Sequence, residues 1–318
     1  MKTLSKLRVF ALIFFAIAFV SCDNNDDPVD NTITGLALRN SNLKILVQAL
    51  TRADLATTLQ GVGPFTVFAP TDAAFTTFLK TTPYATINDV PKDVLTQILL
   101  NHVVSGSVKS TALSTGYIKT LAKGSASTSN TLSMYVDLTS GVKLNGVANV
   151  TTADVMASNG VIHVVDGVIG LPTIVTHAMA NPMFSTLVSA LTYNPQSGFA
   201  GVLSGTTSSP FTVFAPTNAA FTAFLGETTY SSLSAIPANV LEKTLKYHVV
   251  TGANVLSTAL TKNQVITTFS GQTATVKFTP TRLLDVSGRN CNIIATDVQC
   301  SNGVIHVLEK VLLPTFAN

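Results

Sequence analysis

The residues of this chain best suited to chemistry are its histidines, which could bind a metal ion or carry protons near neutral pH. The sequence contains five of them: His102, His163, His177, His248 and His306. No His-x-x-x-His or His-Glu pairing is present, so the spacing gives no metal site and no cofactor is expected. His102 continues the apolar helical stripe of Val94 and Ile98, and His163 alternates with valines in an apolar strand. We therefore expect core histidines whose ring nitrogens bond to local backbone groups, and an exposed His177 in the segment between two repeats.

A nucleophilic enzyme would need a serine or cysteine on a strained turn, together with a histidine and an acid. No Gly-x-Ser-x-Gly motif occurs, and Gly61-Val-Gly63 is an isolated glycine pair without a following helix start that could hold a phosphate. Asp72 is replaced by Asn218 where the surrounding sequence recurs. That exchange would remove acid–base chemistry, but either residue can cap a helix. The sequence therefore predicts no enzymatic activity.

Two cysteines near the C-terminus form a candidate disulfide. If Ala295-Thr296 makes a two-residue turn, Cys291 and Cys300 become cross-strand neighbours within disulfide reach. The corresponding residues of the other repeat, Ala148 and Ala157, are both alanine. A paired replacement fits a disulfide, which an exported location permits. The alternative is two buried free thiols.

The elements that must position these residues occur twice along the chain. The segment Phe65-Thr-Val-Phe-Ala-Pro-Thr-Asp-Ala-Ala-Phe75 returns as 211–221 with one change in eleven positions. Asn159-Gly-Val-Ile-His-Val164 returns unchanged as 302–307. The copies are too far apart for a solenoid, whose repeats run about 20–50 residues, and fit two whole domains of about 100–150 residues.

Each copy predicts the same order of elements: a helix, a short strand ended by proline, a helix capped by threonine, a second helix, and then strands that end in a hairpin. In the first repeat the expected ranges are 42–59, 65–69, a helix after Thr71, 92–102 and strands 154–158 and 161–165. In the second repeat they are 184–192, 211–215, a helix after Thr217 and 238–248. Asn159-Gly160 predicts a type I′ turn in the hairpin.

These phrases resemble the two conserved boxes of the fasciclin-1 (FAS1) family. The first box is similar to Thr66–Phe75 and the second to Asn159–Asp166, and the family's Tyr-His dipeptide is matched by Tyr247-His248. The first repeat reads Asn101-His102 at that place. The resemblance covers about residues 32–318. It implies an α+β fold of two tandem FAS1 domains, each a wedge-shaped β-sandwich flanked by helices. Family members are secreted or membrane-anchored and are implicated in adhesion to cells, matrix or cell-wall polysaccharide.

In adhesive animal members of the family, an Asp-Ile pair just before the second box has been linked to receptor binding. The matching pairs here read Asp-Val. The candidate adhesion residues are Asp154, Val155, Asp297, Val298, Tyr247 and His248. The alternative is that both aspartates cap a turn and both valines belong to the core.

The N-terminus has the pattern of an export signal. Three bases and no acid precede twelve apolar residues, 9–20, a run shorter than the roughly 20 residues that span a membrane. Phe19-Val-Ser-Cys22 resembles a bacterial lipobox, in which the cysteine is lipidated, whereas Ala16-Ile-Ala18 would suit an ordinary signal peptidase. We expect lipidation at Cys22.

An acidic stretch follows Cys22 and is too polar to bury a core, so it predicts a flexible tether. It resembles the stretch that follows the lipidated cysteine in surface-exported lipoproteins of the Bacteroidetes type. We therefore expect an outer membrane lipoprotein at the cell surface, or otherwise in the periplasm. The expected organisation is a signal peptide at 1–21, a tether at 22–31, and FAS1 domains at 32–172 and 173–318.

The composition restricts the choice of partner. Only 11% of the residues are charged, tryptophan is absent, and the bases are scattered without a run or stripe, which argues against nucleic acid. We expect an exported binding protein, anchored in the membrane by its lipid, that contacts an extracellular protein or polysaccharide in adhesion. The alternatives are a receptor for a small apolar ligand or oligosaccharide, and an envelope scaffold.

Overall fold

The computed structural model describes residues 29–193 and 198–316, and the chain from Asn31 onward forms one compact unit. The predicted export signal, the lipidation site Cys22 and most of the tether lie outside the described residues. No helix among the described residues is both long enough and apolar enough to cross a membrane.

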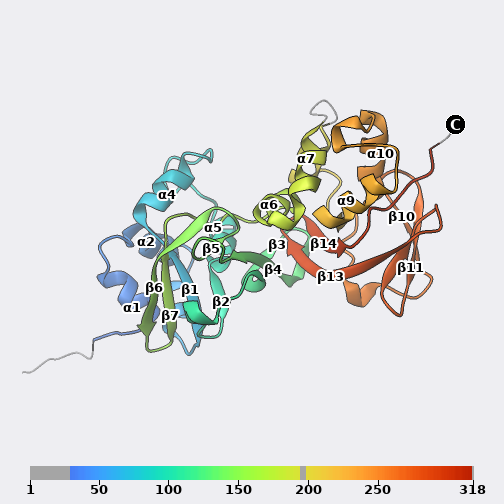
Figure 1. Ribbon diagram of the computed structural model, residues 1–318. Coiled ribbons are helices and arrows are strands. Elements are labelled where there is room, and N and C mark those ends of the chain that lie inside the picture. The colour runs from blue at the N-terminus through green and yellow to red at the C-terminus, as the bar shows by residue number, and fades with distance from the viewer. Residues whose placement is uncertain (1–28, 194–197, 317–318) are drawn as a thin grey trace, which may run out of the picture. The chain divides into compact units, whose positions relative to one another are not determined.

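Each repeat builds a mixed seven-stranded sheet (Figure 1). The first sheet contains β1 (Phe65–Pro70), β2 (Val103–Ser105), β3 (Gly116–Gly124), β4 (Ser127–Asp137), β5 (Lys143–Leu144), β6 (Ala148–Ala157) and β7 (Gly160–Val165), in the order β2-β1-β7-β6-β5-β4-β3. The second contains β8 (Phe211–Pro216), β9 (Val249–Thr251), β10 (Val265–Thr267), β11 (Thr273–Lys277), β12 (Arg282–Leu284), β13 (Asn290–Cys300) and β14 (Gly303–Leu308), in the order β9-β8-β14-β13-β12-β11-β10. The two orders are the same topology, and the parallel pairs are β1–β7 and β8–β14.

The helices follow the predicted order but begin with an element that the sequence did not reveal. The first repeat has α1 (Ile33–Arg39), α2 (Lys44–Arg52), α3 (Ala56–Gln60), α4 (Asp72–Leu79) and α5 (Lys92–Leu100). The second has α6 (Ile174–Ala180), α7 (Ser185–Tyr193), α8 (Phe199–Ser204), α9 (Asn218–Gly226) and α10 (Ala238–Tyr247). The single helix predicted for 42–59 is two helices, because the chain turns at Asp54, whose φ is 55°. Together with the sheets, these helices confirm the α+β class.

Alternate residues of β1 face two different cores, as strand geometry requires. Val67 and Ala69 of β1 pack with the helices, which Figure 1 shows beside β1 and β7. Phe68 points the other way and packs against Met134 of β4 and Leu144 of β5. The two ends of the sheet therefore enclose a second core between them. The second repeat divides its core in the same manner.

The hairpin lies where the sequence predicts it, but its turn is one residue earlier. Ala157 pairs with Gly160, so the two turn residues are Ser158 and Asn159, and neither has a positive φ. The predicted type I′ turn is therefore wrong. Gly160 is required for another reason: a Cβ there would lie 2.0 Å from the Phe65 carbonyl oxygen. Its missing side chain lets β1 and β7 approach as parallel neighbours.

Candidate functional site

The Asp72/Asn218 position ties two helices together. Thr71 and Thr217 cap their helices as predicted, with each hydroxyl accepting from the backbone N–H three residues on. Asp72 Oδ1 accepts from the backbone N–H of Ile45, 2.7 Å away, at the start of α2. Asn218 Oδ1 accepts from Thr186 N–H in α7, at 2.9 Å. A carboxylate and an amide oxygen perform this task equally, which explains the exchange without acid–base chemistry.

The asparagine of the second repeated phrase joins its hairpin to the first helices. Asn159 Oδ1 accepts from the N–H of Ile33 at 2.9 Å, and its Nδ2 donates to the carbonyls of Leu59 at 2.8 Å and Gly61 at 2.9 Å. The equivalent residue, Asn302, makes the same three bonds in the second repeat. Both phrases therefore contribute to the frame of the domain.

Two of the histidines connect a helix to the end of the repeat: His102 follows α5 in the first repeat, and His248 follows α10 in the second. His102 Nδ1 donates to Ile98 O at 2.8 Å, and its Nε2 accepts from Ile169 N–H at 2.9 Å. His248 repeats both contacts with Thr244 and Leu312. Burial lowers the pKa of each ring to about 4, so both stay neutral near neutral pH. These are the core histidines that the sequence predicts.

The histidines of the second phrase are also buried. His163 Nε2 donates to Val108 O at 2.9 Å, and the ring stacks on Phe68 with centroids 5.4 Å apart. His306 bonds in the same way to Val255 O and stacks on Phe214. Among the residues that the structure describes, no three His, Cys, Asp or Glu side chains gather into a possible metal site.

The expectation that His177 is exposed is wrong. It lies in α6, a helix that the sequence did not reveal. Its ring is fully buried and packs edge-on against the ring of Tyr117, with the ring centroids 5.4 Å apart. The Tyr117 hydroxyl accepts from Asn181 Nδ2 at 3.2 Å. Burial lowers the pKa of His177 to about 3.

The candidate adhesion aspartates bond to their own domains. Asp154 has a φ of 60° at an irregularity of β6, and its carboxylate accepts from the N–H of Ser110 at 2.8 Å and from the Ser110 hydroxyl at 2.6 Å. The hydroxyl bond is the main reason that the pKa of this carboxyl is lowered. Asp297 bonds to Ser257 through the same pair of groups. Val298 is buried and Val155 is half-buried. Contact of these residues with a partner stays a prediction.

Tyr247 and His248 require a correction as surface candidates. The Tyr247 side chain is completely buried; its hydroxyl donates to Thr273 O at 2.6 Å and accepts from Val286 N–H at 3.0 Å. Burial raises its pKa to about 12. His248 is only 3% exposed. Neither side chain presents a surface to a partner in the folded domain, so both are left out of the proposed contact surface.

The cysteines do not form the expected disulfide. Both lie on the continuous strand β13, where Cys291 pairs with Leu283 and Cys300 with Gly303, and both are free and buried. Nine residues of strand at about 3.3 Å each separate them by about 30 Å, far beyond the roughly 7 Å limit for a bridge. The predicted turn at Ala295-Thr296 is an irregularity in the strand pairing. The alternative of two buried thiols is confirmed.

The first repeat carries two open grooves. One open groove of about 720 Å³ lies between α2, α4 and the segment 82–88, and another of about 630 Å³ lies along 60–64 and 156–160. An apolar cavity in the second repeat, lined by Phe184, Leu187 and Phe199 among others, holds about 20 Å³. Sequence reasoning missed the grooves because their walls come from separate helices and loops.

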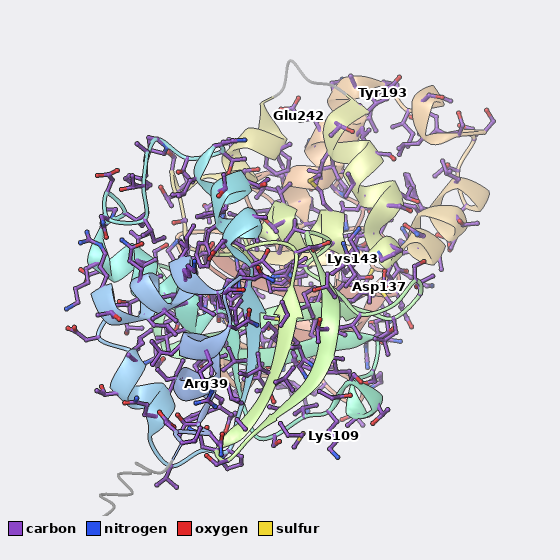
Figure 2. The ribbon with its side chains drawn as sticks, turned by 90° about the vertical axis from the view of Figure 1, so that its left-hand side faces the viewer. Arg39, Lys109, Asp137, Lys143, Tyr193 and Glu242 are labelled. Carbon is purple, nitrogen blue, oxygen red and sulfur yellow. The ribbon has the colours of Figure 1, made fainter. Side chains whose placement is uncertain are left out.

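Four labelled charged side chains of the first repeat come from separate places on its surface. Arg39 and Lys109 lie towards the end of β6 and β7, and Asp137 and Lys143 lie away from them (Figure 2). The scattered bases of the sequence argue against nucleic acid as a partner, and this stays a prediction.

Comparison with known proteins identifies both repeats. The fasciclin domain model matches residues 41–172 and 182–314. Protein sll1483 of Synechocystis sp. is 41% identical over 138 residues, which cover 43% of this chain and 72% of that protein. The cell surface glycolipoprotein MPB83 of Mycobacterium bovis is 34% identical over 143 residues, covering 44% of this chain and 60% of that protein.

Among solved structures, a FAS1 domain pair from the insect cell adhesion molecule Fasciclin I matches with a TM-score of 0.49 and 20% identity, covering 87% of this chain and 97% of that one. Of the relatives matched by sequence, MPB83 is a cell surface protein. Because the family model matches both repeats and most of the sequence, this chain belongs to the fasciclin domain family, with two copies of the domain.

Proposed function

We propose that this protein is an exported, lipid-anchored binding protein that mediates adhesion through contact with an extracellular protein or polysaccharide. One observation carries the proposal. Within the described residues, four of the histidines are buried and bonded to backbone carbonyls and no cluster of metal-binding side chains is found, whereas open grooves large enough for part of a partner lie on the surface. Such a molecule offers a surface for binding.

The anchoring part of the proposal is supported by the sequence. Phe19-Val-Ser-Cys22 places a cysteine directly after the apolar run, as a lipobox does, and an acidic tether follows it. The relative MPB83 is a cell surface glycolipoprotein, which combines the same location with the same kind of anchor. We infer that Cys22 carries the lipid and that the two domains stand off the membrane.

The alternative of a receptor for a small apolar ligand receives no support from the volumes. The enclosed apolar cavity of the second repeat holds about 20 Å³, which is room for about one water molecule. Ligand pockets are typically about 300–1,000 Å³. An apolar ligand would have to displace side chains such as Phe184 and Leu187 from a packed core.

The test is protease shaving of intact cells that produce the full chain, followed by pull-down with the shaved, soluble domains. We expect the domains to be released from intact cells and to retain a protein or polysaccharide from the cell exterior. A Cys22→Ser variant is the control, since it should leave the membrane fraction. Resistance of the chain to protease until the cells are broken would overturn the surface location.

A further inference from the structure

The larger groove of the first repeat is open and is lined by residues of two helices and of the loop that leads to α5. Gln48 belongs to α2, Thr76 to α4, and Tyr84 and Asn88 to that loop. Its volume of about 720 Å³ lies within the range of sites that hold small ligands or a short stretch of a polymer.

A pair of side-chain amides bridges this groove. Gln48 Nε2 donates to Asn88 Oδ1 at 3.2 Å, so residues forty positions apart fix each other's orientation. Both side chains are exposed. The second group of each amide, Gln48 Oε1 and Asn88 Nδ2, makes no hydrogen bond within the described residues. The pair therefore presents one acceptor and one donor side by side. Two neighbouring hydroxyls of a sugar ring match that arrangement, because each hydroxyl can both donate and accept.

The rest of the lining combines one aromatic ring and three threonine hydroxyls with apolar side chains, and it is nearly free of charge; the apolar residues are Ile45, Leu79, Pro83, Ala85 and Ile87. Tyr84 supplies a half-buried ring with an apolar face and a polar end, and its hydroxyl has no partner within the described part of the chain. Lys80 is the only charged residue of the lining. Asp89, next to the lining, is occupied by the N–H and hydroxyl of Thr86, both at 2.8 Å. An anionic ligand would therefore find Lys80 as its single counter-charge in the lining.

We propose that this groove binds a neutral polysaccharide, with the Gln48–Asn88 amide pair bonding to adjacent hydroxyls of a sugar and the Tyr84 ring contacting a sugar face. The inference rests on the proposed function and names the partner for one site. A peptide fits less well, because the lining consists of helix and loop residues without a free strand edge, and it has no cationic cluster for an acidic motif.

The second repeat provides a natural comparison. Asp72 contacts Ile45 as Asn218 contacts Thr186, so Gln48 corresponds to Ser189. Tyr84 and Asn88 correspond to Tyr230 and Ser234, counted from the shared Phe75 and Phe221 of the repeated phrase. The tyrosine is kept and the amide pair is absent, and the Tyr193 hydroxyl donates to the Ser234 carbonyl at 2.8 Å. The site is therefore assigned to the first repeat only.

The experiment is affinity gel electrophoresis of the mature chain through gels that contain dextran, mannan, laminarin, xyloglucan or hydroxyethyl cellulose, with polygalacturonate as the anionic comparison. We expect retardation by at least one neutral polymer. Gln48→Ala and Asn88→Ala should each weaken it up to about tenfold, the value of one lost hydrogen bond. Tyr84→Ala should weaken it as well, whereas the matched variant Tyr230→Ala should leave it unchanged.

The variants also separate binding from folding. Gln48 and Asn88 are exposed and away from the core, so their variants should keep the unfolding temperature of the wild type. Migration unaffected by every neutral polymer overturns the inference, as does retardation that survives both amide variants. Capture of an extracellular protein by a chain that no neutral polymer retards would overturn this inference and leave the proposed adhesive function standing. If a neutral polymer retards the chain but the chain resists protease on intact cells, this inference stands and the proposed surface function is overturned.

Discussion

Replacing Asn302 by alanine tests whether the repeated Asn-Gly phrase serves the frame of the domain. The side chain is 1% exposed, and it bonds to the Ile174 N–H at 3.0 Å and to the carbonyls of Leu203 and Gly205, each at 2.8 Å. Alanine removes all three hydrogen bonds at once and leaves these three backbone groups without the side-chain amide. At about 1 kcal/mol for each bond, the free energy of unfolding should fall by about 3 kcal/mol.

The corresponding change in the first repeat should cost less. Asn159→Ala removes three equivalent bonds, but Gly61 is exposed, so its carbonyl can bond to water instead. We therefore expect about 2 kcal/mol for Asn159→Ala.

Urea unfolding followed by circular dichroism measures both values. Asn149→Ala is the control, because that side chain makes an exposed bond to Asp166 and should cost no more than about 0.5 kcal/mol. Losses at Asn302 and Asn159 no larger than the control would refute the role given to the phrase.

Three further predictions concern the second repeat. Burial lowers the pKa of His248 to about 4 from a usual 6.5. The stability associated with its neutral ring should therefore be present above about pH 6.5 and lost as the pH falls towards 4. Urea unfolding measured across this pH range should show the loss, and the loss should be smaller in His248→Gln. Burial raises the pKa of both the Cys291 and Cys300 thiols, so a thiol reagent should label neither in the folded chain and both after unfolding, and a non-reducing mass spectrum that lacked two free thiols would contradict the strand assignment. Gly303→Ala should prevent stable folding, because its Cβ would lie 2.3 Å from the Phe211 carbonyl oxygen. A Cβ at Gly201 meets nothing within 4 Å, so Gly201→Ala in α8 should add up to about 1 kcal/mol to the free energy of unfolding. Thermal unfolding of the two variants tests both expectations.

Much of the architecture could be predicted from the sequence because the repeated phrases carry strong local signals. The proline that ends β1, the threonine cap of α4 and the apolar stripe ending at His102 are each visible within a few residues. The duplication then extended every local prediction to a second domain. The burial of His102, His163, His248 and His306 followed from these stripes.

The predictions that proved wrong have a common physical cause. In each case, the residue that determines the local structure lies far away in the sequence. Gly160 is glycine because of the Phe65 carbonyl on a parallel neighbour. A local turn at Ala295-Thr296 predicts a hairpin that would pair Cys291 with Cys300. In the structure the strand continues there, with a shift in its pairing to β14. His177 is buried by the distant Tyr117.

The candidate site illustrates the same limit. The amides of Gln48 and Asn88 are brought together only by the packing of α2 beside the segment before α5, and no local pattern marks them as a pair. The tyrosine of the Tyr-His dipeptide looked suited to a surface contact, but the sheet encloses it.

The central claim, that this protein acts by binding from the cell surface, is tested most directly by attachment of the producing cells. A strain that lacks the gene should lose attachment to its natural surface, the full chain should restore it, and the Cys22→Ser variant should fail to restore it although its domains fold. Attachment that is the same in all three strains would contradict the account.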